Sequence, residues 1–424
     1  MNIYYRNCVL LDGTKDMVPQ PNMTVVTEDG IIKAVQPDGK VPEGVSIVDL
    51  NGQYLMPGLI NMHVHLPASG KPSKTDSKKL VHLIRSSAIL KKGAVKLCEI
   101  YAKTELMSGC TTIRTVGGID DLDTIVRDSI NAGSSVGPRI LAADYAVTVK
   151  GGHMVGTVAK AAESIEETVK MVDDLAKYHP DLIKIMITGG VLDATKIGEP
   201  GVLRMQPEYV KAACDEAHRL GLYVAAHVES PEGVRVALEN GVDTIEHGAK
   251  PDEQIINLFR EKKAKLITTI SPALPFAEFD PAVSGCDEMG RANGKIVFDG
   301  VVECSKAALA NDIPVGLGTD TGCPFVTHYD MWRELNYFCK YVGVSPAFAL
   351  YTATLRNAEI AGIADVTGSI APGKSADFIV SEKNPLEDFA NLRKLQIVVM
   401  KGHAYRSPKV KKYPAIETEL DKWL

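Results

Sequence analysis

Eight short apolar runs, separated by stretches with helix-like spacing, fill the middle of the chain. The runs lie near residues 59–66, 111–117, 139–147, 182–188, 223–228, 244–248, 265–271 and 314–320. The segments 165–175 and 207–218 between them carry apolar residues three and four positions apart, as on one face of a helix. Eight β/α units across roughly 300 residues predict an α/β fold in which the strands close into a (β/α)8 TIM barrel. A doubly wound open sheet is the alternative interpretation of the same alternation.

Lys184 stands in the middle of the apolar run 182–188, where a strand would aim it at the same face as Leu182 and Met186. A lysine is rarely buried without a partner, because a desolvated ammonium group is costly. No acidic residue within that run is placed to neutralise it. Carboxylation of the amine would explain such a lysine, because the resulting carbamate is negatively charged and can bridge two metal ions. We therefore expect a modified Lys184 inside a metal site.

Five histidine and aspartate side chains stand at the ends of the predicted strands, namely His63, His65, His227, His247 and Asp320. His63 and His65 lie two positions apart on one strand, so both imidazoles can reach a single ion. A lone strand histidine is usually a core residue, and Asp320 could be a turn aspartate. The five together with Lys184, however, suit a divalent metal. Ligands on the first and eighth strands can meet in a closed barrel, whereas an open sheet keeps them apart.

The same segments resemble the amidohydrolase superfamily. The residues that carry the resemblance are Pro57–His65, Lys184, Ala226–His227, Glu246–Gly248, Gly318–Asp320 and, near the C-terminus, 368–378. Within the superfamily the chain resembles the imidazolonepropionase-like and Xaa-Pro dipeptidase-like branch with a carbamylated lysine, as segments 112–118, 150–153 and 184–190 indicate. The resemblance implies a hydrolase of C–N bonds with two divalent metal ions, expected to be zinc. We also expect a homo-oligomer.

The resemblance also implies how the ligands divide between the two ions. One ion is held by His63, His65 and Asp320, the other by His227 and His247, and the carbamate on Lys184 bridges them. A hydroxide shared by paired ions is a nucleophile near neutral pH, because the ions lower the pKa of water. Asp320 takes the proton of the attacking hydroxide and passes it to the leaving nitrogen. The expected scissile bond is an amide, including a cyclic amide.

Four further side chains are candidates for contact with the substrate. His153, which follows two glycines, could stabilise the oxyanion or could cap a loop. Glu229 stands where dipeptidases carry a tyrosine for the substrate carboxylate, so it would favour an N–H or cationic group. It could equally be a solvated acid before a helix. Arg114 and Tyr145 complete the set, although the family often has aspartate after the arginine and this chain has threonine.

Three other functions stay open on the sequence. A Xaa-Pro-type dipeptidase would share the metal site. A mononuclear deaminase of the same superfamily usually lacks the lysine on the fourth strand and carries glutamate where this chain has Ser230. A catalytically inactive barrel scaffold would have lost ligands, whereas all six positions are intact here.

The two ends of the chain contain short strand-like runs, one of them with an Asp29-Gly30 turn signal. They predict a small β-sandwich domain from residues 1–57 and 365–424, with the barrel domain spanning 58–364. A formal net charge of −6 over 424 residues favours a small-molecule substrate and argues against nucleic acid and membrane as partners. Eight scattered cysteines without a C-x-x-C pair, and the absence of a signal-peptide pattern, predict a reduced protein in the cytoplasm.

Overall fold

The computed structural model describes residues 2–424, and the chain divides into two compact units. Unit 1 comprises Met1–Asn61, Ala102–Ile113 and His328–Leu424, and unit 2 comprises Met62–Tyr101 and Arg114–Thr327. The domain boundaries expected from the sequence, 1–57 plus 365–424 around 58–364, stay a prediction.

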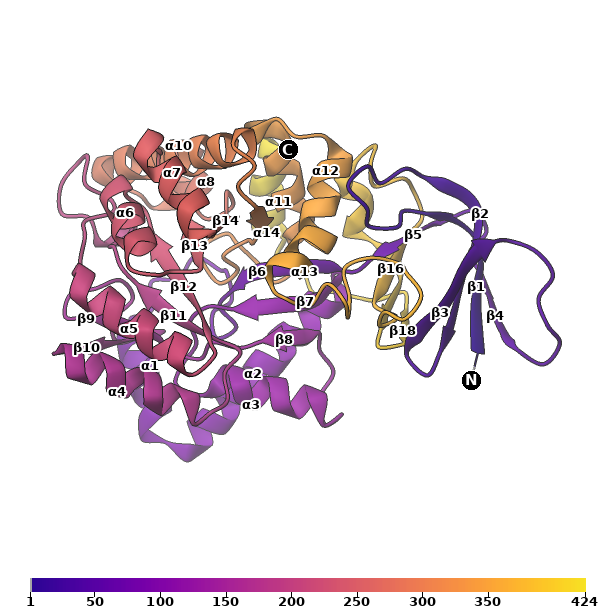
Figure 1. Ribbon diagram of the computed structural model, residues 1–424, viewed down its shortest axis with the longest axis horizontal. Helices are drawn as coiled ribbons and strands as arrows, with labels where there is room; N and C mark the ends of the chain where they lie inside the picture. The colour runs from indigo at the N-terminus through magenta and orange to yellow at the C-terminus, as the bar shows by residue number, and fades with distance from the viewer. Residues whose placement is uncertain (1) are drawn as a thin grey trace. The chain divides into compact units, whose positions relative to one another are not determined.

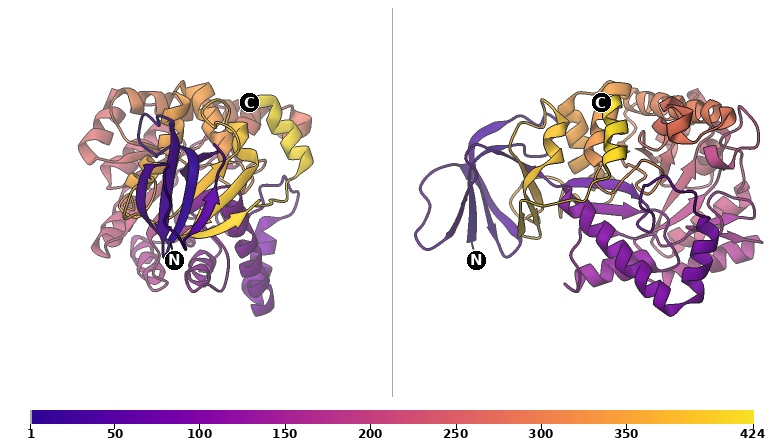
Figure 2. Two further views of the ribbon diagram at one scale, coloured as in Figure 1. Left: turned by 90° about the vertical axis from the view of Figure 1, so that its right-hand side faces the viewer. Right: turned by 180° about the vertical axis from the view of Figure 1, so that it is seen from behind.

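Unit 1 contains one eight-stranded sheet to which both ends of the chain contribute. Its order is β18-β17-β16-β5-β1-β2-β3, with β4 paired to β1. The strands are β1 (Asn2–Leu10), β2 (Gln20–Glu28), β3 (Ile31–Pro37), β4 (Ser46–Asp49), β5 (Tyr54–Pro57), β16 (Phe378–Ser381), β17 (Leu395–Met400) and β18 (His403–Arg406). The left view of Figure 2 shows the indigo N-terminal strands and the yellow C-terminal strands in this sheet. The expectation that the two ends build one β unit is therefore confirmed, and its strands are hydrogen-bonded into a single sheet.

Alternation along these strands builds the apolar core of unit 1. Tyr5 and Phe378 are fully buried, and their rings meet edge to face with centroids 4.9 Å apart. The two residues belong to opposite ends of the chain, so this contact ties the ends together. Asp29 and Gly30 form the predicted turn between β2 and β3, and both have positive φ angles of 50° and 82°. Two such residues in a row are typical of the tight hairpin turn that matches the strand twist.

Unit 2 contains a parallel seven-stranded sheet with the order β10-β9-β11-β12-β13-β14-β15. Its strands are β9 (Ala146–Val149), β10 (Ala159–Ala162), β11 (Leu182–Met186), β12 (Tyr223–Val228), β13 (Thr244–His247), β14 (Lys265–Thr268) and β15 (Val315–Leu317). A three-stranded sheet, β6-β7-β8, is formed by β6 (Leu59–Val64), β7 (Cys110–Thr115) and β8 (Arg139–Leu141). Each of the eight predicted strands is thus present, the third of them as the pair β8 and β9.

Hydrogen bonds join the two sheets at two places. After β15, the N–H of Asp320 donates to the carbonyl of His63 on β6 at 2.9 Å. At the other place, the N–H of Asp181, directly before the interior strand β11, donates to the carbonyl of Ala142, which follows β8, at 2.7 Å. Gly318 makes the first approach possible, because a Cβ atom at that position would lie 2.5 Å from Cβ of His63. The first and last predicted strands therefore lie side by side.

Helices follow the strands and cover the outer side of the parallel sheet (Figure 1). Those in or entering unit 2 are α1 (Ser77–Ser86), α2 (Ala88–Met107), α3 (Leu122–Asn131), α4 (Ile165–Ala176), α5 (Pro207–Arg219), α6 (Pro231–Glu239), α7 (Glu253–Lys262), α8 (Ala273–Glu278), α9 (Pro281–Ser284) and α10 (Glu288–Ala310). Those in unit 1 are α11 (Met331–Tyr337), α12 (Pro346–Tyr351), α13 (Asn357–Ile360) and α14 (Pro414–Leu420). In α4 the buried positions are Thr168, Met171, Val172 and Leu175, one face of a helix.

Two expectations about the environment of the chain can be compared with the described residues. Among residues 2–424, no helix is both long enough and apolar enough to cross a membrane. All eight cysteines have free thiols in this part of the chain.

Candidate metal centre

The six predicted metal ligands come together in unit 2, at the carboxyl ends of its strands. His63, Lys184, His227 and His247 lie on β6, β11, β12 and β13, and His65 and Asp320 follow β6 and β15. Parallel strands bring their carboxyl ends to one edge, and for that reason six residues spread over 258 positions can meet. His247 and Asp320 have positive φ angles of 68° and 59°. Such backbone conformations are costly for non-glycine residues and cluster at functional sites.

His63, His65 and Asp320 form the first part of the centre. Nε2 of His65 lies 3.1 Å from Oδ1 of Asp320, and Nε2 of His63 lies 3.5 Å from the same oxygen. The opposite ring nitrogens are held from behind. Nδ1 of His63 contacts a carboxylate oxygen of Glu246 at 2.8 Å, and Nδ1 of His65 contacts the carbonyl of Gly117 at 2.8 Å. Both acceptors require a proton on Nδ1, so each Nε2 keeps a lone pair directed at the centre.

His227 and His247 form the second part and are held in the same manner. Nδ1 of His247 contacts the hydroxyl of Thr269 at 2.7 Å. Nε2 of His227 donates to the carbonyl of Gly189 at 3.2 Å, which leaves the lone pair of its Nδ1 for the centre. The rings of the two histidines are 4.8 Å apart between centroids.

Burial keeps the imidazoles of His63, His227 and His247 in the neutral form that can bind metals. Burial lowers the pKa of His63 to about 4 and those of His227 and His247 well below the usual value. For His65, burial opposes the charged form, but the hydrogen bond and charge of Asp320 raise its pKa. The carboxyl of Asp320 is also buried, yet His63 and His65 hold its pKa well below the usual range. An ionised Asp320 facing the neutral imidazoles of His63 and His247 is a donor set suited to a divalent cation.

Two groups of three side chains could each hold a metal ion. In the first group, one ligand atom each of His63, His247 and Asp320 lie within 4.8 Å of one another. In the second group, His227, Glu229 and His247 satisfy the same limit. The structure therefore places Glu229 close enough to His227 and His247 to bind an ion with them. The sequence did not predict this role for Glu229. His247 belongs to both groups and lies between them.

Lys184 is fully buried, and its Nζ atom has no hydrogen-bond partner. Burial lowers the pKa of its amine to about 8, and the nearby charge of Arg114 acts in the same direction. Glu246 and Asp320 are the opposite charges that act on it. A buried amine without a partner is costly for a fold, so Lys184 is the least satisfied polar group among the six predicted ligands.

Glu246 contacts the ring nitrogen of His63 that points away from Asp320, and the sequence had not indicated a role for it. Its carboxylate is fully buried and pairs with the guanidinium of Arg114 at 2.6 Å while it accepts Nδ1–H of His63. Burial opposes its ionised form, but Arg114 and the bond from His63 hold its pKa well below the usual range. Arg114 also donates to the carbonyl of Met62 at 2.8 Å and to the hydroxyl of Thr244 at 3.2 Å. Its side chain is thus fully engaged beneath the ligands. The only signal in the sequence was the acid directly before His247.

His153 and Glu229 lie against the second part of the centre. The ring of His153 stacks on that of His227, with centroids 4.2 Å apart and planes 5° from parallel. Its Nδ1 contacts the carboxylate of Asp193, a residue that the sequence did not single out. The Oε2 atom of Glu229 is buried without a hydrogen-bond partner, and burial, with Asp320 and Asp193 nearby, raises the pKa of this carboxyl to about 8.

Tyr145 is the predicted site residue that the structure does not bring to this cluster. Its hydroxyl donates to the carbonyl of Met171 on α4 at 3.4 Å. Its ring lies beneath the ammonium of Lys160, 3.9 Å from the centroid. The side chain therefore packs against α4, and Tyr145 lies in the irregular segment 142–145 between β8 and β9, which the predicted single strand 139–147 did not include.

The chain is similar to known proteins over most of its length. The sequence model of the amidohydrolase family matches residues 54–404. The chain belongs to the amidohydrolase family. The crystal structure of a candidate prolidase from Bifidobacterium longum is similar over 99% of this chain and 98% of that chain, with 36% identity and a TM-score of 0.87.

Two curated proteins are also similar to this amidohydrolase. Ochratoxinase from Aspergillus niger is 25% identical over 95% of this chain and 85% of that protein. Imidazolonepropionase from Geobacillus kaustophilus is 23% identical over 85% of this chain and 83% of that protein. The resemblance to imidazolonepropionases and Xaa-Pro dipeptidases is confirmed, and the protein is a hydrolase that acts on carbon–nitrogen bonds.

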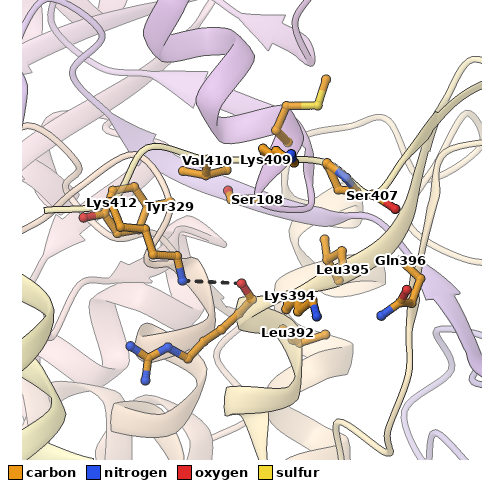
Figure 3. A pocket seen from close by; sticks show the side chains of 13 residues that line it. Ser108, Tyr329, Leu392, Lys394, Leu395, Gln396, Ser407, Lys409, Val410 and Lys412 are labelled. Carbon is orange, nitrogen blue, oxygen red and sulfur yellow. Dashed lines mark hydrogen bonds between the residues drawn. The ribbon is translucent and has the colours of Figure 1, made fainter. Parts of the chain in front are cut away.

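A separate cavity of about 370 Å³ lies within unit 1 (Figure 3). Lys394, Lys409 and Lys412 line it together with Tyr329 and Leu395. The ammonium of Lys412 donates to the carbonyl of Arg393 at 3.4 Å. None of the predicted ligands lines this cavity, so it is not the metal centre of the amidohydrolase.

Proposed function

We propose that this amidohydrolase is a binuclear metal-dependent hydrolase of amide bonds, including cyclic amides, with a carbamate on Lys184. The observation that supports this best is the buried Nζ of Lys184, which lacks a partner beside two groups of metal-binding side chains. A carbamate formed from CO2 would replace an unpaired amine by an anion that two cations can share. Zinc fits a site rich in imidazole, and carboxylate oxygens suit it as well.

The residues of the chain divide the work of hydrolysis between them. His63, His65 and Asp320 would hold one ion, and His227 and His247 the other, with Lys184 between. Bound ions would supply a nucleophile near neutral pH and polarise the substrate carbonyl. Asp320 takes the proton of the attacking water and delivers it to the leaving nitrogen, which an ionised carboxylate at the centre can do. His153, held by Asp193, donates to the oxyanion.

The substrate class is proposed from Glu229. The raised pKa keeps the buried carboxyl of Glu229 mostly protonated by itself, but next to bound cations it would ionise, and its carboxylate would then repel a substrate carboxylate and favour an N–H or cationic group. Neutral and cationic amides are therefore better substrates in this proposal than Xaa-Pro dipeptides, although a prolidase-like structure is among the relatives. Arg114 acts in this proposal by positioning Glu246 and His63, and a substrate contact by Tyr145 stays a prediction.

Two alternatives make different use of the same barrel. In a mononuclear deaminase, a glutamate would be expected at Ser230, but the hydroxyl of Ser230 caps α6 by accepting from the N–H of Gly233 at 3.2 Å. In an inactive scaffold, the neutral imidazoles and the buried Lys184 would have no function to offset their cost.

The proposal extends to the architecture and the setting of the protein. We propose that the hydrogen bonds between the two sheets close β6–β9 and β11–β15 into a (β/α)8 barrel, and that the terminal sheet folds into a sandwich. The domain boundaries, the cytoplasmic location and a homo-oligomeric state are part of the same proposal.

Metal analysis of the purified protein tests the proposed centre. Two equivalents of zinc per chain are expected, whereas one equivalent favours the deaminase and none favours the scaffold. A screen of dipeptides, N-acyl amino acids, lactams and imidazolones against the metal-loaded protein then tests the substrate class. Hydrolysis limited to carboxylate-bearing dipeptides would contradict the role given to Glu229.

A further inference from the structure

The loop that follows β11, residues 189–204 and here called the β11 loop, carries the hydrogen-bond partner of His153. Asp193 lies in the 3-10 turn η1 (Val191–Asp193) of this loop, and its carboxylate contacts Nδ1 of His153. The same carboxylate accepts the N–H of Gly190 at 3.1 Å. The position of the loop therefore decides how the ring of His153 is oriented against His227, on which it stacks.

The base of the β11 loop is fixed to the strands beside it. The N–H of Gly189 donates to the carbonyl of Val202 at 2.9 Å, which joins the two ends of the loop. Gly201 lets the returning chain pass close to the segment after β12, because a Cβ atom at this position would lie 2.3 Å from the carbonyl oxygen of Glu229. These contacts hold the ends of the loop but not its tip.

The tip of the β11 loop is held by one side chain from a distant part of the sequence. The amide of Asn293 on α10 accepts the N–H of Gly198 at 2.8 Å and donates to the carbonyl of Lys196 at 2.9 Å. Among the described residues, 195–201 make no other hydrogen bond to a group outside the loop. Lys196 is only three positions from Asp193, so Asn293 ties down the part of the loop that carries this carboxylate.

The surroundings of Asn293 give it a fixed place in the fold. Its side chain is fully buried and shares a face of α10 with Val297 and Val301, four and eight positions further on. The adjoining Gly294 packs closely on α8, because a Cβ atom there would lie 2.5 Å from Cβ of Phe276. A buried amide is costly unless its donor and its acceptor are both bonded, and the β11 loop supplies both partners.

We propose that Asn293 is a positioning residue for the hydrolase, which acts through Asp193 on His153 without touching substrate. This inference rests on the function proposed above, in which His153 donates to the oxyanion. Without Asn293 the tip of the loop has little to keep it in place, since Leu192 and Ile197 are 68% and 58% exposed. Asp193 then holds His153 less well, and a small displacement of a catalytic group lowers the rate of the chemical step.

A double-mutant cycle tests this inference on the metal-loaded protein, with the amide that it hydrolyses fastest. Asn293→Ala should lower kcat by about tenfold or more, with little change in KM or zinc content, because only the orientation of His153 is disturbed. In a His153→Ala background the same substitution should lower kcat by no more than about twofold, since the group that Asn293 positions is gone. Asn311→Ala is the matched control, because Asn311 ends α10 and its amide also donates and accepts.

Tryptic cleavage after Lys196 reports on the loop itself and does not depend on catalysis. The bond should be cut about tenfold faster in Asn293→Ala than in the unmodified protein, because the released tip is accessible to the protease more of the time. Asn293→Asp keeps the acceptor for Gly198 but loses the donor, so it should be cut at an intermediate rate and replaces Asn293→Ala if that variant does not fold. Circular dichroism shows whether each variant is folded.

The inference is overturned if Asn293→Ala is cut no faster than the unmodified protein, or if it lowers kcat equally with and without His153. An unchanged kcat in Asn293→Ala overturns it as well, when His153→Ala does lower kcat. That result leaves the proposed function intact, because only the link from Asn293 to His153 has failed. Full turnover by His153→Ala, in contrast, contradicts the role proposed for His153 and removes the basis of the inference with it.

Discussion

Nδ1 of His63 donates a hydrogen bond to Oε2 of Glu246, 2.8 Å away, although 183 positions separate the two residues. The same carboxylate pairs with Arg114 at 2.6 Å, and all three side chains are buried. This arrangement sets the tautomer of His63 and thereby directs its other nitrogen to the metal centre. Glu246 is thus a positioning residue for His63, a proposed metal ligand, and Arg114 keeps it ionised.

Glu246→Gln should weaken both the metal centre and the fold. The amide cannot neutralise Arg114, and leaving a buried charge without its partner costs about 3–5 kcal/mol of unfolding free energy. Zinc affinity should fall by about 10- to 100-fold, because His63 loses the group that orients it. Titration with a zinc chelator and urea unfolding measure the two effects. Glu239→Gln, an exposed acid at the end of α6, is the control and should change neither.

Lys184→Ala should remove the bridge between the ions and lose most of the metal and activity. Short carboxylic acids such as acetate or propionate, added with bicarbonate, should restore part of the metal content and part of the activity, since they supply an anion to the space left by the side chain. Metal content and turnover are the measurements, with the exposed Lys170→Ala on α4 as the control. A variant at Lys184 that keeps two metal ions and full activity would falsify the carbamate assignment.

Asp320→Asn should lower turnover by about 100-fold or more, because the amide keeps the shape of the side chain but cannot accept the proton. Metal content should fall much less than turnover. Asp312→Asn is a closely matched control, since Asp312 is exposed and has nearly the same backbone conformation, with φ of 57° against 59° for Asp320. Normal turnover by Asp320→Asn would place the proton transfer on another group.

Glu229→Tyr should shift substrate preference towards amides that carry a carboxylate. The unmodified protein is expected to cleave Xaa-Pro dipeptides poorly, because Glu229, once ionised beside the bound cations, repels a substrate carboxylate in the buried site. The ratio of kcat/KM for a Xaa-Pro dipeptide to that for the corresponding dipeptide amide measures the preference. Glu232→Tyr, an exposed neighbour on α6, should leave the ratio unchanged. Efficient Xaa-Pro hydrolysis by the unmodified protein would contradict this assignment.

Asp123 predicts a pH dependence of stability that is separate from catalysis. Both of its carboxylate oxygens are buried without a hydrogen-bond partner, and burial, followed by the charge of Asp144, raises its pKa to about 7. The folded state therefore binds this proton more tightly than the unfolded state, whose pKa is about 3.9. Its contribution to stability is present at low pH and is lost as the pH rises from about 4 to 7.

Asp123→Asn should remove this pH dependence. The unfolding free energy of the variant, relative to that of the unmodified protein, should rise between pH 4 and pH 7 by as much as several kcal/mol. Urea unfolding at a series of pH values measures the difference, with the exposed Asp128→Asn on the same helix as the control. A difference that does not change with pH would show that Asp123 is ionised in the folded protein.

Features that depend on neighbouring positions could be predicted from the sequence. The apolar runs fixed where the strands begin, and two-residue spacing placed His63 and His65 on one face. The charge of Lys184 inside an apolar run predicted an unusual buried amine, and the structure leaves that amine without a partner. The turn at Asp29 and Gly30 followed in the same way from local backbone preferences.

Features that join distant positions were decided by the tertiary structure alone. Arg114 was expected to contact substrate, but strand packing sets it against Glu246, 132 positions away. Asp193 became relevant only because its loop meets His153. The physical reason is that an ion pair or hydrogen bond depends on distance in space, whereas periodicity and local charge reveal only which way each segment faces.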